Sequence, residues 1–406
     1  MHKLIEKKFD KWARKIRDEH GVPLSFRLSN GRELQLAGAD NQQVVVTIHN
    51  KTALPSLMSA TLDKLADAYI QEKIDVQGGL REIISVAYKL AMASNASTQT
   101  RFQRVVKHLS HSRKSDRKAI EYHYDVSNDF YKLWLDRNMV YSCAYFASGD
   151  EDLETAQMAK IDHILKKIDL KPNQTLLDIG CGWGALVIRA AQKYGAQCLG
   201  ITLSENQFAL ANARIKQAGL AGRVEIRLID YRDLEGSFDR ITSVGMFEHV
   251  GKRNLPTYFS KIQQLLKDEG VAMNHGITST DADSGDTILG GGDFIDKYVF
   301  PEGELPHLSL VLDKMQRSGL EIFDVENLRR HYANTLGIWT ERFEQNSQLI
   351  RSLVDEKKYR IWRIYLAGCA HAFETDQISI YQIVCRKAGR PAALLPWSRR
   401  YMYEQA

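Results

Sequence analysis

The sequence predicts an α/β protein, with a large domain built on a seven-stranded, mostly parallel sheet behind a smaller α+β N-terminal domain. From about residue 119 to residue 406, apolar strand-like runs alternate with amphipathic helical stretches, which is typical of a parallel sheet covered by helices. Residues 1–95 instead contain short alternating stretches around an Asn-Gly turn. The length of 406 residues and the hydrophobic fraction of 44% allow both domains to bury a core.

Residues 1–95 are predicted to form a lipid- or membrane-binding domain that opens with a basic amphipathic helix. A basic helix with aromatic residues on its apolar stripe is typical of interfacial lipid binding. The alternative, a solvated basic face whose stripe packs on the same domain, has equal support. The stripe consists of Ile5, Phe9, Trp12 and Ile16, strands are expected at 24–28, 33–36 and 44–48, and a later helix includes 80–91.

Residues 96–118 are predicted to form a basic linker. Ser recurs through it, and residues 101–118 carry seven Lys or Arg against the single acid Asp116. Such a segment fits contact with anionic lipid or with nucleic acid. The net charge of the whole chain is +5, which is too mild to decide between these two partners.

The five cysteines are scattered and include no C-x-x-C pair or ligand-type cluster. We therefore expect reduced thiols, a cytoplasmic location and no metal centre. The amino terminus has no apolar signal core. No apolar run is long enough to span a bilayer, so we do not expect an integral membrane protein.

The predicted large domain spans residues 119–406 and contains an ordered series of strands. In open parallel sheets, ligands bind beyond the carboxyl ends of the strands, so polar residues at these ends are the first candidates for a site. The strands are expected at 175–179, 197–201, 224–228, 238–244, 271–274, 321–325 and 378–385, and helical stretches at 185–193, 205–218, 255–268, 308–318 and 339–373.

The most informative motif follows the first of these strands: Asp178, then Gly180, Gly182 and Gly184 at alternate positions. Such glycines allow positive φ and let the backbone approach a ligand closely. The helix that follows presents free amides, which suit a carboxylate. The spacing D-x-G-x-G-x-G differs from the dinucleotide pattern and resembles the nucleotide loop of Rossmann-like class I S-adenosylmethionine methyltransferases. This resemblance implies a pocket for S-adenosylmethionine.

The next two strand ends supply further candidates for this pocket. Thr202 stands where an acid usually grips the ribose hydroxyls, Ser204 is a natural helix N-cap, and Gln207 is a candidate for the ribose contact. Asp230 offers a carboxylate to the adenine amine, and Tyr231 offers a ring to cover the adenine. Their order on consecutive strand ends favours a cofactor pocket over separate structural roles.

A second resemblance is carried by the segments 121–131, 141–146, 245–251, 294–301 and 332–336. Together they resemble the cyclopropane-fatty-acid synthases and the related mycolic-acid cyclopropane synthases, and the N-terminal region resembles the phospholipid-modifying bacterial branch. The resemblance implies transfer of a methylene group from S-adenosylmethionine to the cis double bond of unsaturated acyl chains in membrane phospholipids. The product would carry a cyclopropane ring.

The resemblance also implies a bound bicarbonate ion, which acts in this family as the general base. The base removes a proton from the transferred methyl group, and it must lie within hydrogen-bond reach of that proton. By motif position, the implied residues around the ion are Cys143, Glu248, His275, Tyr332 and, through its backbone, Ile277.

Cofactor contacts are implied in the same way, with one departure from the family pattern nearby. Gly276 stands where Thr or Ser is usual, so a hydroxyl between His275 and Ile277 is lost. The implied cofactor contacts are Tyr141, Ser142, Gly180, Gly182, Gln207 and Tyr231.

Two alternatives stand beside this reaction. The first is a fatty-acyl C-methyltransferase that leaves a methyl or methylene branch without ring closure. The second is a nonenzymatic membrane- or RNA-binding protein on a methyltransferase scaffold, against which the intact glycine loop counts. The expected partners are unsaturated phospholipids and an anionic membrane surface at the inner face of the cell membrane, with no nucleic acid; the resemblance is compatible with a homodimer.

Overall fold

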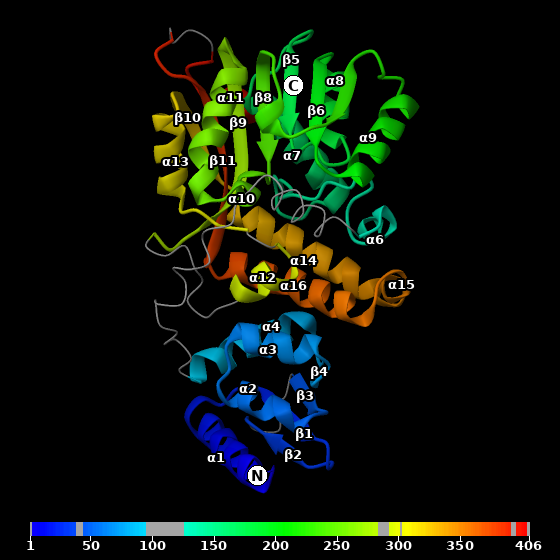
Figure 1. Cartoon of the computed structure of the whole chain (residues 1–406), viewed down its shortest axis with the longest axis vertical. Coiled ribbons are helices and arrows are strands. Elements are labelled where there is room, and N and C mark those ends of the chain that lie inside the picture. The colour runs from blue at the N-terminus through cyan, green and yellow to red at the C-terminus, as the bar shows by residue number, and fades with distance from the viewer. Residues whose placement is uncertain are drawn as a thin grey trace. The chain divides into compact units, whose positions relative to one another are not determined.

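The computed structural model describes residues 2–37, 44–94, 126–282, 292–300, 303–390 and 395–403 (Figure 1). The chain divides into two compact units. Unit 1 comprises residues 1–110, 286–301 and 347–375, and unit 2 comprises the remainder. The domains proposed from the sequence are contiguous stretches, whereas unit 1 takes in two segments from the second half of the chain. The linker predicted at 96–118 lies outside the described residues.

Unit 2 is built on a seven-stranded sheet with the order β10-β11-β9-β8-β5-β6-β7. The pairs from β9 to β7 are all parallel, and β11 runs antiparallel to both of its neighbours. The predicted mostly parallel α/β sheet is confirmed. The strands are β5 Thr175–Ile179, β6 Gln197–Thr202, β7 Val224–Leu228, β8 Phe238–Val244, β9 Leu266–Ser279, β10 Leu320–Asn327 and β11 Ile378–Lys387.

The two faces of this sheet form separate hydrophobic cores, because successive side chains of a strand point to opposite faces. Leu176 of β5 packs in one core with Val187 of α8 (Ala185–Tyr194). Leu177, the next residue, packs in the other core with Phe259 of α11 (Leu255–Leu265). All four side chains are fully buried. Helices therefore cover both faces of the sheet (Figure 1).

Two further helices of unit 2 begin at residues that suit a helix N-terminus. Asp152 caps α7 and Ser204 caps α9, each by accepting from the backbone amide three residues later. No helix in the described part of the chain combines the length and apolarity that crossing a membrane requires. The remaining bounds are α6 Asn128–Lys132, α7 Leu153–Lys167, α9 Glu205–Gln217, α10 Phe247–Val250, α13 Leu308–Arg317, α14 Arg329–Gln345 and α17 Arg400–Tyr403.

The long helical stretch expected at 339–373 consists of three helices. α14 ends at Gln345 in unit 2, and α15 (Ser347–Leu353) follows at once in unit 1. Asp355 then caps α16 (Glu356–Glu374) by accepting from the amide of Lys358 at 2.7 Å. The helical periodicity of the sequence therefore continues from unit 2 into unit 1 and does not mark the boundary between them.

Unit 1 contains a four-stranded sheet with the order β2-β1-β3-β4, in which β1 and β3 are parallel. Its helices and strands confirm a smaller α+β domain, although the short strand β4 is absent from the sequence-based expectation. The strands are β1 Leu24–Leu28, β2 Glu33–Gln35, β3 Val44–Ile48 and β4 Ile74–Gln77, and the helices are α1 His2–His20, α2 Leu54–Met58, α3 Leu62–Ile70, α4 Leu80–Ala93, α12 Gly292–Tyr298, α15 and α16.

The apolar stripe of α1 packs into the core of unit 1. Phe9 and Ile16 are buried, and the ring of Phe9 lies 5.2 Å from the ring of Phe26 on β1. Ile5 and Trp12 pack against the same core. This packing supports the solvated-face alternative over an apolar stripe that is free to enter lipid. The exposed side of the helix is basic and includes Lys7, Lys8, Lys11, Arg14 and Lys15.

Hydrogen-bonded charges join the later helices to the N-terminal residues within unit 1. Arg360 of α16 donates to Asp75 at 2.6 Å and to the carbonyl of Tyr69 at 3.0 Å, and its side chain is 9% exposed. On α12, the hydroxyl of Tyr298 donates to Asp67 of α3 at 2.6 Å. The N-terminal region thus folds around two segments that come far later in the sequence.

Arg360→Met is expected to destabilise unit 1 by roughly 2–4 kcal/mol, because Asp75 and two backbone carbonyls lose their buried donor. The measurement is the free energy of opening from native-state hydrogen exchange in peptides of residues 62–93. The control is Lys358→Met, an exposed lysine on the same helix, with an expected change of at most about 0.5 kcal/mol. An Arg360→Met effect as small as the control would contradict this account.

Candidate active site

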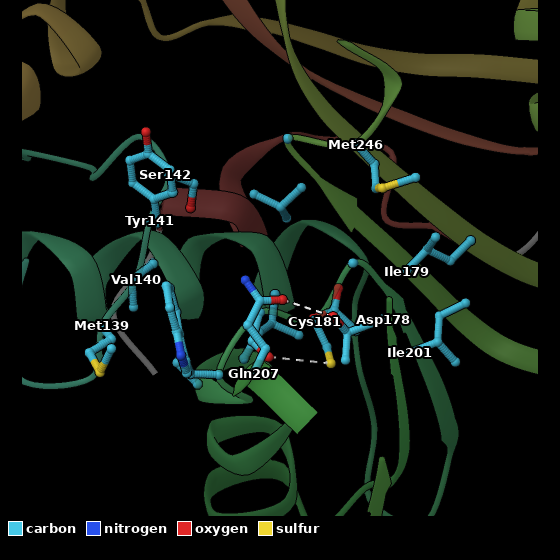
Figure 2. A pocket seen from close by; sticks show the side chains of 18 of the residues that line it. Met139, Val140, Tyr141, Ser142, Asp178, Ile179, Cys181, Ile201, Gln207 and Met246 are labelled. Atoms are coloured by element: carbon cyan, nitrogen blue, oxygen red, sulfur yellow. Dashed lines mark hydrogen bonds between the residues drawn. The ribbon is translucent and has the colours of Figure 1, made fainter. Parts of the chain in front are cut away.

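A cavity of about 130 Å³ lies at the carboxyl ends of β5, β6 and β8, all within unit 2. Figure 2 shows Asp178, Ile179 and Ile201 on the strand side of the cavity, with Tyr141 and Ser142 on the segment across from them. This edge is where ligands bind in open parallel sheets. The cavity therefore coincides with the site that the strand-end residues predict.

The glycine motif forms the turn between β5 and α8 in the wall of this cavity. Gly180, Gly182 and Gly184 have φ angles of +79°, +54° and +84°, which other residues rarely adopt. Gly180 and Gly182 line the cavity, and a Cβ on Gly180 would lie 2.8 Å from the side chain of Met246. The turn thus brings backbone to the cavity surface where a side chain would not fit.

Most of the residues predicted to bind the cofactor line the cavity, and three do not. Gly184 is the N-cap of α8, and Ser204 caps α9. The carboxylate of Asp230 accepts from the Arg232 guanidinium at 2.9 and 2.6 Å. The predicted residues that line the cavity are Tyr141, Ser142, Asp178, Gly180, Gly182, Thr202, Gln207 and Tyr231.

Thr202 orients the side chain of Gln207. The Thr202 hydroxyl donates to Gln207 Oε1 at 2.8 Å, and both side chains are buried. This hydrogen bond occupies the amide oxygen and directs the donating NH₂ group elsewhere. A ribose hydroxyl is an acceptor for such a donor. The pair therefore gives a physical basis for the ribose contact expected of Gln207.

The segment that carries Tyr141 is held by buried polar contacts. Asp136 accepts from the amides of Asn138 at 2.9 Å and Val140 at 2.7 Å. Gln157 of α7 donates to the carbonyls of Val140 at 3.2 Å and Ser142 at 2.8 Å. Several buried hydrogen bonds to one segment favour a single backbone conformation. This wall of the cavity is therefore rigid.

Tyr141 lies among other aromatic rings. Its ring centroid is 5.4 Å from those of Trp134 and Trp339. Tyr131 is 5.7 Å from Tyr141 and 5.1 Å from Trp183, which also lines the cavity. Aromatic faces attract cations within about 6 Å. The cavity can thus receive a positively charged ligand such as a sulfonium.

Two buried titratable side chains, Glu248 of α10 and His275 of β9, belong to the predicted anion site. Glu248 Oε1 accepts from the amide of Ile277 at 2.7 Å, and His275 stands two residues earlier on the same face of β9. Glu248 is 8% exposed and His275 is 1% exposed. Among the described residues, Glu248 Oε2 and both ring nitrogens of His275 have no hydrogen-bond partner. These three atoms are therefore available to hydrogen-bond a polar ligand.

Cys143 and Tyr332 meet at one backbone carbonyl. The carbonyl oxygen of Leu328 accepts from Cys143 Sγ at 3.8 Å and from the amide of Tyr332 at 3.0 Å. Burial raises the pKa of the Cys143 thiol above its ordinary value, so the thiol stays protonated and unreactive. The five residues predicted around the anion therefore form two groups, one of Glu248, His275 and Ile277 and one of Cys143 and Tyr332.

Gly276 has a packing role that explains the departure from the family pattern. A Cβ at this position would lie 2.4 Å from the ring of Phe247, which is 1% exposed. The ring occupies the space that a Thr or Ser side chain would need. Phe247 also directly precedes Glu248, so this contact fixes the start of α10 against β9.

Burial sets the protonation states of the acid and the imidazole. It raises the pKa of Glu248 to about 7, although the hydrogen bond from the Ile277 amide opposes the shift. Burial lowers the pKa of His275 well below its ordinary value, and the positive charge of Lys160 acts in the same direction. At neutral pH the imidazole is therefore uncharged, and the carboxyl group carries a proton part of the time. Such a pair can donate hydrogen bonds to an oxyanion.

Sequence reasoning missed Lys160 of α7, which lines the cavity with its side chain 2% exposed. A signal for it exists in the sequence. Lys160 lies four residues after Ala156 and four before Ile164, both of which are fully buried. A lysine inside the apolar stripe of a helix indicates an ammonium group that faces the protein interior.

Comparison with known proteins gives relatives along nearly the whole chain. The family model described as mycolic acid cyclopropane synthetase matches residues 111–383, and a domain of unknown function matches residues 12–99. A probable fatty acid methyltransferase of Pseudomonas putida is 43% identical over 385 residues, which cover 94% of this chain and 96% of the relative.

Cyclopropane synthases are similar over the second part of the chain. The cyclopropane-fatty-acyl-phospholipid synthase of Escherichia coli K12 is 41% identical over 262 residues, which cover 64% of this chain and 66% of the relative. The solved structure of mycolic acid cyclopropane synthase CmaA1, complexed with SAH and CTAB, is 35% identical with a TM-score of 0.64. It covers 67% of this chain and 98% of its own.

Glu248→Gln is expected to remove a pH-dependent loss of stability. The folded chain holds a proton on Glu248 between pH 4.5 and about 7 that the unfolded chain has released, so stability falls as the pH rises through this window. The shift corresponds to about 3 kcal/mol. The variant, which can still accept from the Ile277 amide, should be more stable than the wild type above pH 7 and similar to it near pH 4.5.

The measurement for this variant is the free energy of unfolding in urea at a series of pH values. Glu235→Gln, which changes an exposed glutamate of the same unit, is the control and should follow the wild-type profile. Identical pH profiles for Glu248→Gln and the wild type would show that Glu248 ionises at its ordinary pKa.

Gly276→Ala is expected to lower the stability of unit 2 by about 1–3 kcal/mol, because the added methyl group collides with the ring of Phe247. Phe247→Leu in the same chain should restore part of that loss by vacating the space. The measurement is a double-mutant cycle on the free energy of unfolding. Additive effects of the two substitutions would contradict the contact.

Proposed function

Because the chain belongs to the mycolic acid cyclopropane synthetase family, and is therefore an S-adenosylmethionine-dependent methyltransferase that modifies lipid acyl chains, we propose that it closes a cyclopropane ring. The substrate would be the cis double bond of an unsaturated acyl chain in a membrane phospholipid. The supporting observation is that one short segment, residues 246–249, contributes both to the cavity lining and to the buried acid. Met246 and His249 line the cavity, and Glu248 between them accepts from Ile277 on β9.

Ring closure requires a methyl transfer and the removal of one proton. S-adenosylmethionine supplies an electrophilic methyl group: the alkene attacks it, the C–S bond breaks, and S-adenosylhomocysteine leaves with the electron pair. Positive charge then lies on the neighbouring alkene carbon. A C–H bond of the new methyl group gives its proton to a base, and its electron pair closes the ring.

The residues of the chain stabilise the charges in this sequence. Tyr141 and Trp183 present aromatic rings at the cavity, and each cation–π contact contributes about 0.5–2 kcal/mol. The rigid segment around Tyr141 holds these rings in place before the reaction. The alkene is a weak nucleophile, so stabilisation that increases as charge develops accelerates the transfer.

We propose that Glu248 and His275 hold a bicarbonate ion, with Cys143 and Tyr332 around it. The Ile277 N–H, expected as a contact of the ion, donates to Glu248 instead. The three unpaired buried atoms of Glu248 and His275 can offer two donors to an oxyanion, because the neutral imidazole has one N–H to donate and the protonated carboxyl group has one O–H. The ion, when bound, would supply the base for the transferred methyl group. The Ile277 amide fixes the Glu248 carboxyl group in position.

A second candidate is a fatty-acyl C-methyltransferase that leaves a methyl or methylene branch. The relative from Pseudomonas putida, a probable fatty acid methyltransferase that matches 94% of this chain, favours it. Both reactions begin with the same methyl transfer. They differ in the fate of the cationic carbon, so the cavity residues named above serve either one.

We also propose that the protein works as a peripheral protein at the inner, anionic face of the cell membrane. Each CH₂ group that leaves the bilayer for water costs about 0.8 kcal/mol, so an acyl chain is best taken up directly from the lipid surface. The exposed basic side of α1 is suited to attract that surface, because its apolar side is packed into unit 1.

Glu248→Gln is expected to lower turnover by at least about 100-fold while S-adenosylmethionine binding stays within about threefold of the wild type. Turnover is measured by gas chromatography and mass spectrometry of fatty acid methyl esters after incubation with unsaturated phospholipid vesicles. Binding is measured by calorimetry, and Glu235→Gln is the control. A folded, cofactor-binding Glu248→Gln chain with undiminished turnover would remove Glu248 from the mechanism.

Lys8→Gln together with Lys11→Gln is expected to weaken binding to vesicles rich in phosphatidylglycerol about 30-fold, since each lysine near an anionic surface contributes about 1 kcal/mol. Co-sedimentation measures the binding. Lys216→Gln with Lys358→Gln removes the same charge from exposed sites outside α1 and serves as the control. Equal losses in both double variants would mean that α1 is not the membrane contact.

A further inference from the structure

The segment of residues 143–146 forms neither helix nor strand, and two of its backbone amides hydrogen-bond to side chains of α14. The amide of Ala144 donates to the Thr335 hydroxyl at 3.0 Å, and this hydroxyl donates to the carbonyl of His331 at 2.7 Å. The amide of Phe146 donates to His331 Nδ1 at 3.0 Å. His331 and Thr335 lie four residues apart and therefore on one face of the helix. That face of α14 thus accepts from two alternate amides of the segment.

The ring of His331 adds a second kind of contact to the same segment. It stacks on the ring of Tyr145, with the centroids 4.9 Å apart and the ring planes at 10°. Tyr145 also stacks on His163 of α7 at 4.3 Å, and its amide donates to the carbonyl of Ala156 on α7 at 3.1 Å. Both helices therefore hold residues 143–146 through backbone and ring contacts.

The hydrogen bond from Phe146 requires a neutral imidazole at position 331. A backbone amide can only donate, so Nδ1 is the bare nitrogen of the ring and the proton lies on Nε2. Burial lowers the pKa of His331 below its ordinary value, although the negative charge of Glu326 opposes the shift. The imidazole is therefore uncharged at neutral pH and keeps its acceptor.

We propose that His331 is a positioning residue for the reaction, because it fixes the segment that carries Cys143 relative to Tyr332. The inference rests on the proposed function, in which Cys143 and Tyr332 lie around the bicarbonate ion. Cys143 directly precedes Ala144, and Tyr332 directly follows His331. A misplacement of about 1 Å in an active site can lower the rate on the order of 100-fold. Loss of the His331 acceptor should therefore lower turnover in a chain that still folds.

The first test measures the alkylation of Cys143 by iodoacetamide in the full chain, resolved by mass spectrometry of its peptide. His331→Leu should accelerate this alkylation about tenfold, because the segment opens more often when it loses a hydrogen bond. His331→Asn should stay within about threefold of the wild type, since the amide oxygen of Asn can accept in place of Nδ1. The buried Cys385 of β11 is the internal reference, and its rate should not change.

The second test measures turnover and S-adenosylmethionine affinity of the same variants. His331→Leu should lower kcat on the order of 10- to 100-fold, with the affinity for S-adenosylmethionine within about threefold of the wild type. His331→Asn should recover most of this loss. Thr340→Ala is the control, because the Thr340 hydroxyl donates to the carbonyl of Leu336 within the same helix. This variant should match the wild type in both tests.

Three outcomes would overturn the positioning role. The first is unchanged alkylation of Cys143 in His331→Leu. The second is equal acceleration at Cys143 and Cys385, which would report a general loss of stability. The third is faster alkylation of Cys143 alone with undiminished turnover.

A wild type without turnover on unsaturated phospholipid overturns the proposed function, whereas the alkylation rates would still decide whether His331 holds the segment. If His331→Leu fails to fold, Thr335→Val takes its place with the same expected results, because it removes the acceptor of the Ala144 amide. Thr335→Ser, which keeps the hydroxyl, is then the conservative variant that should recover both measurements.

Discussion

Glu248 and His275 are buried with fewer hydrogen bonds than their polar atoms require, and the rest of the site depends on this. Each unpaired buried polar group costs about 1–3 kcal/mol, so the fold must hold these two residues against relaxation. It does so through β9, which pairs along its length with β8 on one side and β11 on the other. His275 lies within both ladders, and the Ile277 amide holds one oxygen of Glu248. Under the proposed function, a bound oxyanion would supply the missing hydrogen bonds.

The segment between β8 and α11 connects this pair of residues to the cofactor cavity. Met246 touches the glycine turn, Phe247 fills the space over Gly276, and Glu248 reaches β9. Three consecutive residues therefore contact two parts of the site, the glycine turn and β9. A change in any one contact moves the other two, because the helix that carries them is only one turn long. Gly276 leaves room for the ring of Phe247, so the glycine is compatible with the packing of this segment against β9.

Local signals in the sequence were sufficient for the parts of the site that one segment builds by itself. The glycine turn, the bounds of β5, β7 and β8, and the position of Thr202 and Gln207 follow from strand, turn and cap preferences. Contacts between segments that are far apart in the sequence could not be predicted from these local signals. The sequence does not show, for example, that Phe247 excludes a side chain at position 276.

The assembly of unit 1 from distant segments of the chain could likewise not be predicted from local patterns. Helical periodicity predicts α16, and the apolar stripe predicts α1, but neither pattern reveals that both helices share one core. That fact depends on Arg360 meeting Asp75, nearly three hundred residues earlier in the chain. Lys160 is an intermediate case. The apolar stripe of α7 predicts that its side chain is buried, but no sequence pattern shows which group its ammonium contacts.

The central claim is that the base removes a proton from the methyl group that the cofactor has just delivered. The most direct measurement uses S-adenosylmethionine with a trideuterated methyl group and an unsaturated phospholipid, followed by mass spectrometry of the product chain. The account predicts a ring carbon that retains two of the three deuterium atoms. A product chain that retains all three would contradict it, because the proton would then have left from elsewhere.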